Sequence, residues 1–170
     1  MKKLLKVALV AVCFLTVGNF AKAQAKIGYI NFDALIGQMP EAKTVKTTLD
    51  TYSKQFTDQL AVMQTELQNK GKDYQATQAT MTDAVRSAKQ SELQDIQKRM
   101  QDFNTTAQQK FDEKSNELVK PLSDKAHVAV EAVAKEKGYT YVINSAQTQF
   151  IVAPTTDDLM DAVKAKLGIK

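Results

Sequence analysis

The sequence predicts a mainly helical α+β fold, in which a long antiparallel coiled-coil hairpin projects from a small β-sheet body with a C-terminal helix. Three observations predict it. Apolar residues recur at helical spacing from Val45 to Tyr74 and, after a polar stretch, from Val85 to Leu122. Glycine and proline are nearly absent between 41 and 120, where only Gly71 occurs. Short β-prone apolar runs lie near both ends of the chain, outside the helical pattern.

Residues 1–23 have the three parts of a secretory signal peptide. Three lysines lie in the first six residues, residues 4–17 are apolar apart from Lys6 and Thr16, and Ala21 and Ala23 form a small-residue cleavage site. The apolar run is too short for a comfortable membrane span. We therefore expect export through a cleaved signal peptide, which leaves 24–170 as a single domain.

Removal of this segment changes the charge argument. The whole chain carries a formal charge of +4, but four of its 23 basic residues lie in the signal segment, which leaves 19 bases against 19 acids. A neutral mature chain gives no reason to expect nucleic acid as a partner, and it does not favour contact with lipopolysaccharide or a membrane surface. The only cysteine, Cys13, leaves with the same segment, so the mature chain has no disulfide or thiol chemistry.

The body begins with residues 24–38. Residues 25–32 are β-prone and apolar on both faces, as in a buried strand. Residues 33–37 can form a short helical turn, and Pro40 suits the first turn of the next helix.

Residues 40–137 are expected to form the hairpin, with its turn near 77–83. A single helix of more than 80 residues is possible, but a hairpin fits better. In a hairpin, the places where apolar residues are spaced four apart twice in succession, at 52-56-60 and at 103-107-111, lie side by side in the two helices. Local departures from the heptad spacing then face each other. The pairing has residue numbers that sum to 159 or 160, as in Phe56 with Phe103. The predicted seam residues are Leu49, Phe56, Leu60, Met63, Leu67, Leu93, Ile96, Met100, Phe103 and Phe111.

The second arm contains Pro121, which should kink it, and Gly138 is a suitable stop after a basic last turn. Residues 138–170 return to the body. The β-prone runs 139–143 and 148–152 predict a β-hairpin. Thr155 or Thr156 could then cap a last helix with an apolar stripe, which is made of Leu159, Val163 and Leu167.

The strands from both ends of the chain should form one sheet. One small sheet with a single short helix can bury only a small core, although it must support a long helical arm. Its strands are apolar on both faces, so we expect a second copy of the chain to cover the open face. The expected residues of this oligomeric body are Ile27, Tyr29, Ile30, Phe32, Tyr139, Tyr141, Ile143, Phe150 and Val152.

Catalysis is not expected from this sequence. Ser123, Asp124 and His127 can share a helix face, but any regular helix brings such trios together, and no strained turn or oxyanion loop accompanies them. One histidine among scattered carboxylates does not predict a metal site, and no glycine-rich loop predicts a phosphate-binding cofactor.

Five segments carry a resemblance to a known family. They are residues 26–32 (KIGYINF), 39–43 (MPEAK), 118–122 (LVKPL), 133–143 (VAKEKGYTYVI) and 157–163 (DDLMDAV). In this order they resemble the Skp/OmpH-type periplasmic chaperones over essentially all of 24–170.

The resemblance implies a homotrimer whose helical arms surround a cavity. It also implies an ATP-independent holdase that keeps unfolded outer-membrane β-barrel proteins from aggregating in the periplasm. It identifies no individual client-binding residues. Well-known members have cationic arm tips, whereas here acidic residues such as Asp83 and Glu92 offset the bases, so a lipopolysaccharide site is not carried over. The alternative hypothesis is a structural coiled-coil spacer or adaptor of the cell envelope.

Overall fold

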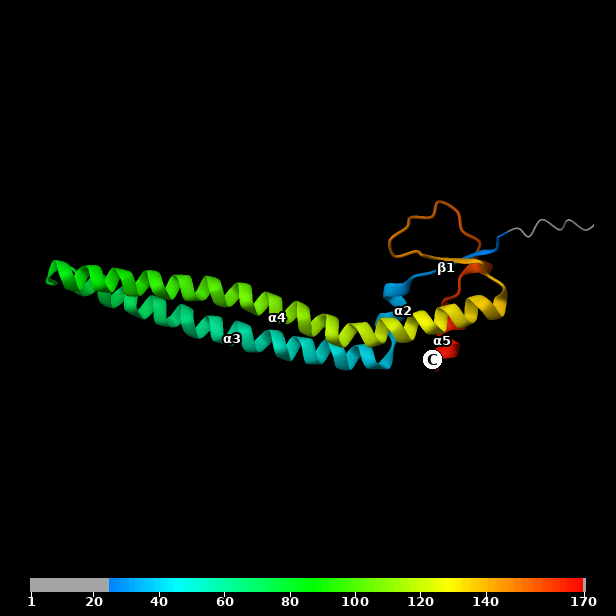
Figure 1. The fold of residues 1–170 in the computed structure, drawn as a ribbon, viewed down its shortest axis with the longest axis horizontal. Helices are drawn as coiled ribbons and strands as arrows, with labels where there is room; N and C mark the ends of the chain where they lie inside the picture. Colours follow the sequence, from blue (N-terminus) through cyan, green and yellow to red (C-terminus); the bar gives the residue numbers. More distant parts are fainter. Residues whose placement is uncertain (1–24, 170) are drawn as a thin grey trace, which may run out of the picture.

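A computed structural model describes residues 25–169, so the predicted signal peptide lies outside the described part of the chain. The structure confirms the predicted fold class: a long helical hairpin extends from a small α/β body (Figure 1). The elements follow in the order β1 (Ile27–Ile30), α2 (Phe32–Gln38), α3 (Pro40–Thr77), α4 (Asp83–Lys137), β2 (Tyr141–Asn144), the 3₁₀ turn η2 (Thr155–Asp157) and α5 (Met160–Leu167).

Helices α3 and α4 run antiparallel and form the arm. The 38 residues of α3 correspond to about 57 Å of helix at a rise of 1.5 Å per residue. The turn between them covers 78–82, inside the range predicted for it. There the Thr82 side chain accepts a hydrogen bond from the backbone N–H of Val85 (3.4 Å) and caps α4. At its other end, α4 stops at Gly138, whose φ of 73° is a left-handed conformation that favours glycine.

The second helix of the arm, with 55 residues, continues past the start of α3 into the body. Figure 1 shows that α4 changes direction in its yellow-green part, the region that contains Pro121. Proline has no N–H to donate within a helix and its ring crowds the preceding turn, which accounts for a bend at this position.

Strands β1 and β2 pair in parallel, with Ile27 opposite Tyr141 and Ile30 opposite Asn144. Parallel strands need a long crossover connection, and here the whole arm serves as that connection. On its other edge β1 bridges to the chain just before α5: Tyr29 pairs with Asp158, and the N–H of Leu159 donates to the carbonyl of Tyr29 (3.0 Å). Strand β1 is therefore central, with a neighbour on both edges.

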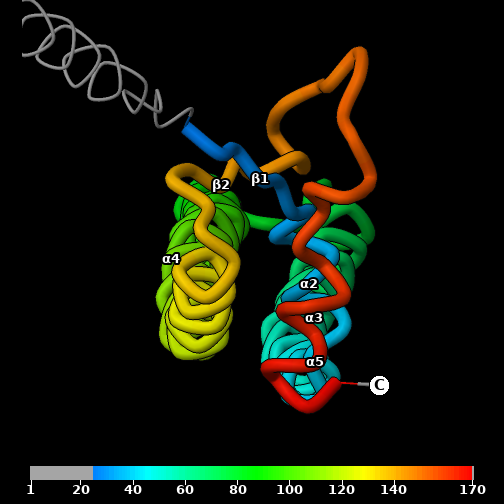
Figure 2. Tube along the Cα trace, turned by 90° about the vertical axis from the view of Figure 1, so that its right-hand side faces the viewer, coloured from blue at the N-terminus to red at the C-terminus, as the bar shows by residue number. Residues whose placement is uncertain are grey.

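The predicted third strand at 148–152 is wrong. These residues lie in the connection between β2 and η2, which Figures 1 and 2 show as an orange loop standing away from the helices. The reason lies in the connection: the chain leaves β2 on one edge of β1 and must reach the opposite edge by Asp158. A path across the sheet cannot also lie alongside β2 as a hairpin strand.

The predicted caps of the last helix are also wrong. Thr155 and Thr156 belong to the 3₁₀ turn, and α5 begins only at Met160, whose N–H donates to the Asp158 side chain (2.9 Å). Similarly, Phe32 is the first residue of α2 and not the end of a strand. The side chain of Asn31 caps that helix by accepting from the N–H of Ala34 (2.9 Å).

The core of the body lies between β1, α2, α5 and the last part of α4. Figure 2, which looks along the arm, shows α5 beside α2 with α4 on the other side. The buried apolar residues are Ile30, Leu35, Met39, Ala126, Ala129, Val130, Val133, Leu159 and Val163. Gly28 permits close packing at the edge of this core, because a Cβ atom there would lie 3.0 Å from the Tyr139 ring.

Among the described residues, 25–169, no helix combines the length and the apolar character that a membrane span requires.

Candidate functional site

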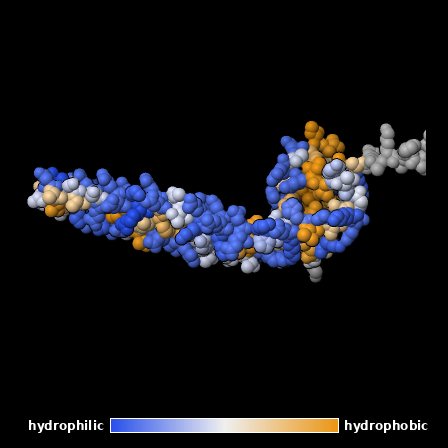
Figure 3. Space-filling model, viewed as in Figure 1, coloured by the Kyte–Doolittle hydropathy of each residue, from blue (hydrophilic) through white to orange (hydrophobic). Residues whose placement is uncertain are grey.

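The body exposes apolar side chains on the loop between β2 and η2. Ile151 is 98% exposed and Val152 is 86% exposed, although both are large aliphatic residues. Figure 3 shows hydrophobic residues at the top of the body, where this loop stands in Figure 1, and a hydrophobic band below it. Two strand residues, Ile27 and Tyr141, are also exposed. Exposed aliphatic residues gathered on one part of a small body mark a contact surface.

The base of this loop is held by specific contacts. The side-chain carbonyl of Asn144 accepts from the N–H of Phe32 (3.1 Å) and from the N–H of Ala146 (3.0 Å), and so ties the end of β2 to the start of α2. The Phe150 ring packs on Tyr29 with centroids 5.3 Å apart. The loop is thus anchored at its ends while its tip stays exposed.

Tyr139 fixes the return of the chain toward α5. Its hydroxyl donates a hydrogen bond to the Asp157 carboxylate (3.0 Å) and lies 3.2 Å from the carbonyl oxygen of Thr156. Burial raises the pKa of Tyr139, and the hydrogen bond to Asp157 raises it further. The ammonium of Lys26 lies 4.0 Å above the Tyr139 ring.

The residues predicted for the oligomeric body fall into two groups. Ile30 is buried, and Tyr29, Phe32, Tyr139, Ile143 and Phe150 are half-buried, whereas Ile27, Tyr141 and Val152 are exposed. The first group packs within this chain or beside its core. The exposed group, together with Ile151, is available to another molecule.

In the arm, all ten predicted seam residues are buried or half-buried. Ile96 is 1% exposed, and the rings of Phe56 and Phe103 lie 6.1 Å apart, a pair that the predicted register brings together. Tyr52 packs edge-on against Phe56 at 4.9 Å. Because the arm is only two helices thick, most of its seam remains partly accessible from the two flanks.

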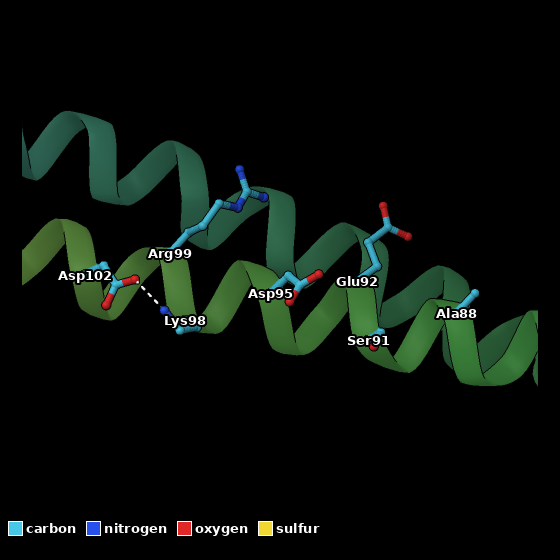
Figure 4. Close-up of a pocket in the computed structure, with 7 residues that line it drawn as sticks. All are labelled: Ala88, Ser91, Glu92, Asp95, Lys98, Arg99 and Asp102. Atoms are coloured by element: carbon cyan, nitrogen blue, oxygen red, sulfur yellow. Dashed lines mark hydrogen bonds and ion pairs between the residues drawn. The ribbon is translucent and has the colours of Figure 1, made fainter.

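One flank of the seam is charged. Lys70 on α3 pairs with Glu92 on α4, and Arg99 on α4 lies 3.5 Å from Glu66 on α3. Figure 4 shows the charged hollow on the nearby surface of α4, where Glu92 and Arg99 point toward the other helix and Lys98 bonds to Asp102 (3.0 Å). These pairs link the two helices in the half of the arm near the turn.

The pH dependence of arm stability should follow from Glu92. Hydrogen bonds from Lys70 and, to a smaller extent, from Lys89 lower the pKa of Glu92 below its ordinary value of 4.5. The ionised Glu92 therefore stabilises the folded arm above that pH, and this contribution is lost as the pH falls through the lowered pKa. We expect the melting temperature, followed by circular dichroism, to fall between about pH 5 and pH 3. The fall should be smaller in Glu92→Gln and unchanged in Glu113→Gln, an exposed control on the same helix. Equal falls in all three proteins would contradict this role for Glu92.

The other flank of the seam carries no charge over several turns, and sequence analysis missed it. Two hollows of about 270 and 410 Å³ adjoin there, since both are lined by Leu60 and Asn104. We call this surface the uncharged groove. Its floor consists of Phe56, Leu60, Met100, Ala107 and Phe111, and its rim of Ser53, Thr57, Ala61, Gln64, Gln101, Asn104 and Gln108, all polar except Ala61. The polar rim residues recur at helical spacing and are all uncharged, although 25% of the residues in the chain are charged. This pattern is present in the sequence and could have indicated the groove.

The trio Ser123, Asp124 and His127 does not assemble as a nucleophile with its base. The His127 ring stacks on Phe32 with centroids 4.3 Å apart, and the Asp124 carboxylate accepts from Lys120 (2.9 Å). Within residues 25–169, no group of three histidine, cysteine, aspartate or glutamate side chains is arranged to hold a metal ion.

These features define a class: a binding protein with a small body and a long helical arm, whose accessible apolar surfaces lie on the body loop and along the arm. The chain belongs to the family described as Outer membrane protein (OmpH-like), whose family model matches residues 26–167.

Similar proteins match this chain over most of its length and most of their own. The protein named Chaperone protein Skp from Yersinia enterocolitica is 28% identical over 147 residues, which cover 82% of this chain and 85% of that protein. Its namesake from Photorhabdus luminescens is 27% identical and covers 90% of this chain and 92% of its own length. The crystal structure of an OmpH-like protein from Caulobacter crescentus CB15 has the same fold, with a TM-score of 0.68, 18% identity and 85% coverage of both chains.

Proposed function

We propose that this protein is an ATP-independent holdase chaperone of the periplasm, which binds unfolded outer-membrane proteins and prevents their aggregation. The family and the relatives named as chaperones support this function. One structural observation carries the proposal: a paired helical arm of about 57 Å leaves its apolar seam partly accessible, and the body at its base carries an exposed apolar loop. The predicted signal peptide supports a periplasmic location.

The proposed assembly is a homotrimer joined through the body. Ile151 and Val152 are nearly fully exposed in the single chain, and Tyr141 and Ile27 are exposed beside the sheet. A second copy that covers them would bury apolar surface that one chain leaves in water. The arms of several copies would then project from a common base and enclose a space.

The proposed clients suit such a space. Strands of an outer-membrane barrel alternate apolar and polar residues, and before insertion their backbone groups and apolar faces are unpaired in water. Unpaired strands of this kind join edge to edge and aggregate. Arms that surround a client keep it from other clients without any chemical step.

The test combines mass and aggregation measurements. Sedimentation of the chain from residue 24 on should give the mass of three copies. Light scattering of a urea-unfolded outer-membrane barrel after dilution should fall when the protein is added at one trimer per client. A monomer that leaves scattering unchanged would contradict the proposal and favour the envelope spacer.

A further inference from the structure

We propose that the uncharged groove of the arm holds an extended, uncharged segment of the unfolded client. This inference rests on the proposed function and assigns it a site. It is carried by the juxtaposition of an apolar floor, which includes Leu60 and Met100, with a rim of amide and hydroxyl side chains.

The floor can accept apolar side chains. The two hollows open along the seam between α3 and α4, where Phe56, Leu60 and Phe111 are half-buried and keep part of their surface in water. An occupant that covers them gains free energy in proportion to the apolar area removed from water. This property alone would suit many occupants, so the rim decides among them.

The rim matches the backbone of an extended peptide. Gln64, Gln101 and Asn104 each carry both donors and acceptors on their side-chain amides. An unfolded segment in extended conformation has one N–H and one C=O per residue to satisfy. Amides can pair with either group at any register, so they bind backbone without selecting one sequence.

The length of the groove fits a short strand. From Ser53 to Gln64 the α3 rim spans about 16 Å at 1.5 Å per residue. An extended chain covers that distance with about five residues at 3.3 Å each, with alternate side chains toward the floor. At the end near the body, Gln108 donates to Asp112 (2.9 Å), where charge resumes and bounds the groove.

Other occupants fit less well. An anionic lipid or phosphate would need bases, and neither hollow is lined by one. A helix from a second copy would be expected to pair its flanking charges with the rim, as Lys70 and Glu92 pair on the opposite flank of this arm. The neutral rim instead complements a segment that carries no charge.

The first experiment introduces two negative charges either on the rim of the groove or, as a control, on exposed positions of the arm outside it. Gln64→Glu with Gln101→Glu places two carboxylates on the rim, and Gln55→Glu with Gln109→Glu places two on exposed positions that line neither hollow. The probe is a urea-unfolded eight-stranded outer-membrane barrel protein, and binding is measured by fluorescence after dilution. We expect the rim pair to raise Kd roughly fivefold to tenfold, because the charges must be desolvated against the client, and the control pair to change it less than about twofold.

A second experiment locates the client directly. The chain from residue 24 on contains no cysteine, so Ala61→Cys in the groove and Gln109→Cys outside it can each carry one benzophenone crosslinker. We expect the client to crosslink predominantly from position 61. Equal crosslinking from both positions, or equal weakening of binding by both charge pairs, would show that the groove is not the client-binding site. Neither result would contradict the proposed chaperone function.

The remaining outcomes are also decisive. Crosslinks from position 61 to another copy of the chain, in the absence of client, overturn the proposal in favour of an interface between arms. A wild-type protein that neither binds the barrel nor reduces its aggregation overturns both the groove and the proposed function. Circular dichroism of each variant verifies that the arm is still helical.

Discussion

Replacement of Leu35 by alanine is expected to lower the free energy of unfolding of the body by about 2–5 kcal/mol. Leu35 lies in α2 with its side chain fully buried, at 0% exposure, among the core residues that join α2, α4 and α5. The loss has two parts: the hydrophobic transfer of the removed methyl groups, and the cavity that a rigid body cannot close. In so small a core, this is a large share of the total stability.

The matched control is Val128→Ala on α4, a residue that is 67% exposed. It also truncates an aliphatic side chain, but the change in stability should stay within about 0.5 kcal/mol because the site is in water. Urea unfolding at one fixed protein concentration is the measurement, since any assembly makes stability depend on concentration. If both variants unfold at the wild-type midpoint, α2 is not part of the stable core.

The second large effect is expected from the body loop. In the double variant Ile151→Asp and Val152→Asp, the single chain should fold normally, because both side chains already lie in water. Assembly should fail, since an unpaired charge in a buried interface costs on the order of 3–5 kcal/mol. That corresponds to a Kd between copies more than about a hundredfold higher. Sedimentation should therefore find single chains at concentrations where the wild type forms the proposed trimer.

The variant Val62→Asp is the control for this loop experiment. Val62 is an exposed valine on α3, so the substitution adds a carboxylate to the arm and leaves the body unchanged. It should sediment as the wild type does. If the loop variant also retains the wild-type mass, assembly does not use this loop. If both variants dissociate, assembly depends on the arm as well as on the body loop.

The arm could be predicted from sequence because its signals are local. Apolar residues at steps of three and four define a seam, and the matched four-residue steps of the two arms give the register in which Phe56 meets Phe103. Gly138 ends α4 by backbone chemistry that depends on a single residue. Each of these inferences needs only a short stretch of chain.

The body loop and the uncharged groove were not predicted from the sequence, because both depend on how distant segments lie in the folded chain. The β-prone residues around Phe150 form no strand, because the connection has to reach the far edge of β1, where Tyr29 pairs with Asp158. Propensity describes a residue's fit to a sheet and cannot say which edges are occupied. The uncharged groove was missed for a related reason: its rim combines residues of two helices, and the unequal flanks become visible only once those helices are paired.

The parallel pairing of β1 and β2 has a consequence for the order of folding. Phe32 at the start of α2 and Asn144 at the end of β2, which are joined by a hydrogen bond, are 112 positions apart, so the body cannot close until the chain beyond the arm has emerged. A disordered loop of that length would make closure slow. The arm can form first from contacts near its turn and then carries the two ends of the chain back together. In a nascent chain, the helical hairpin would thus be the template on which the sheet is assembled.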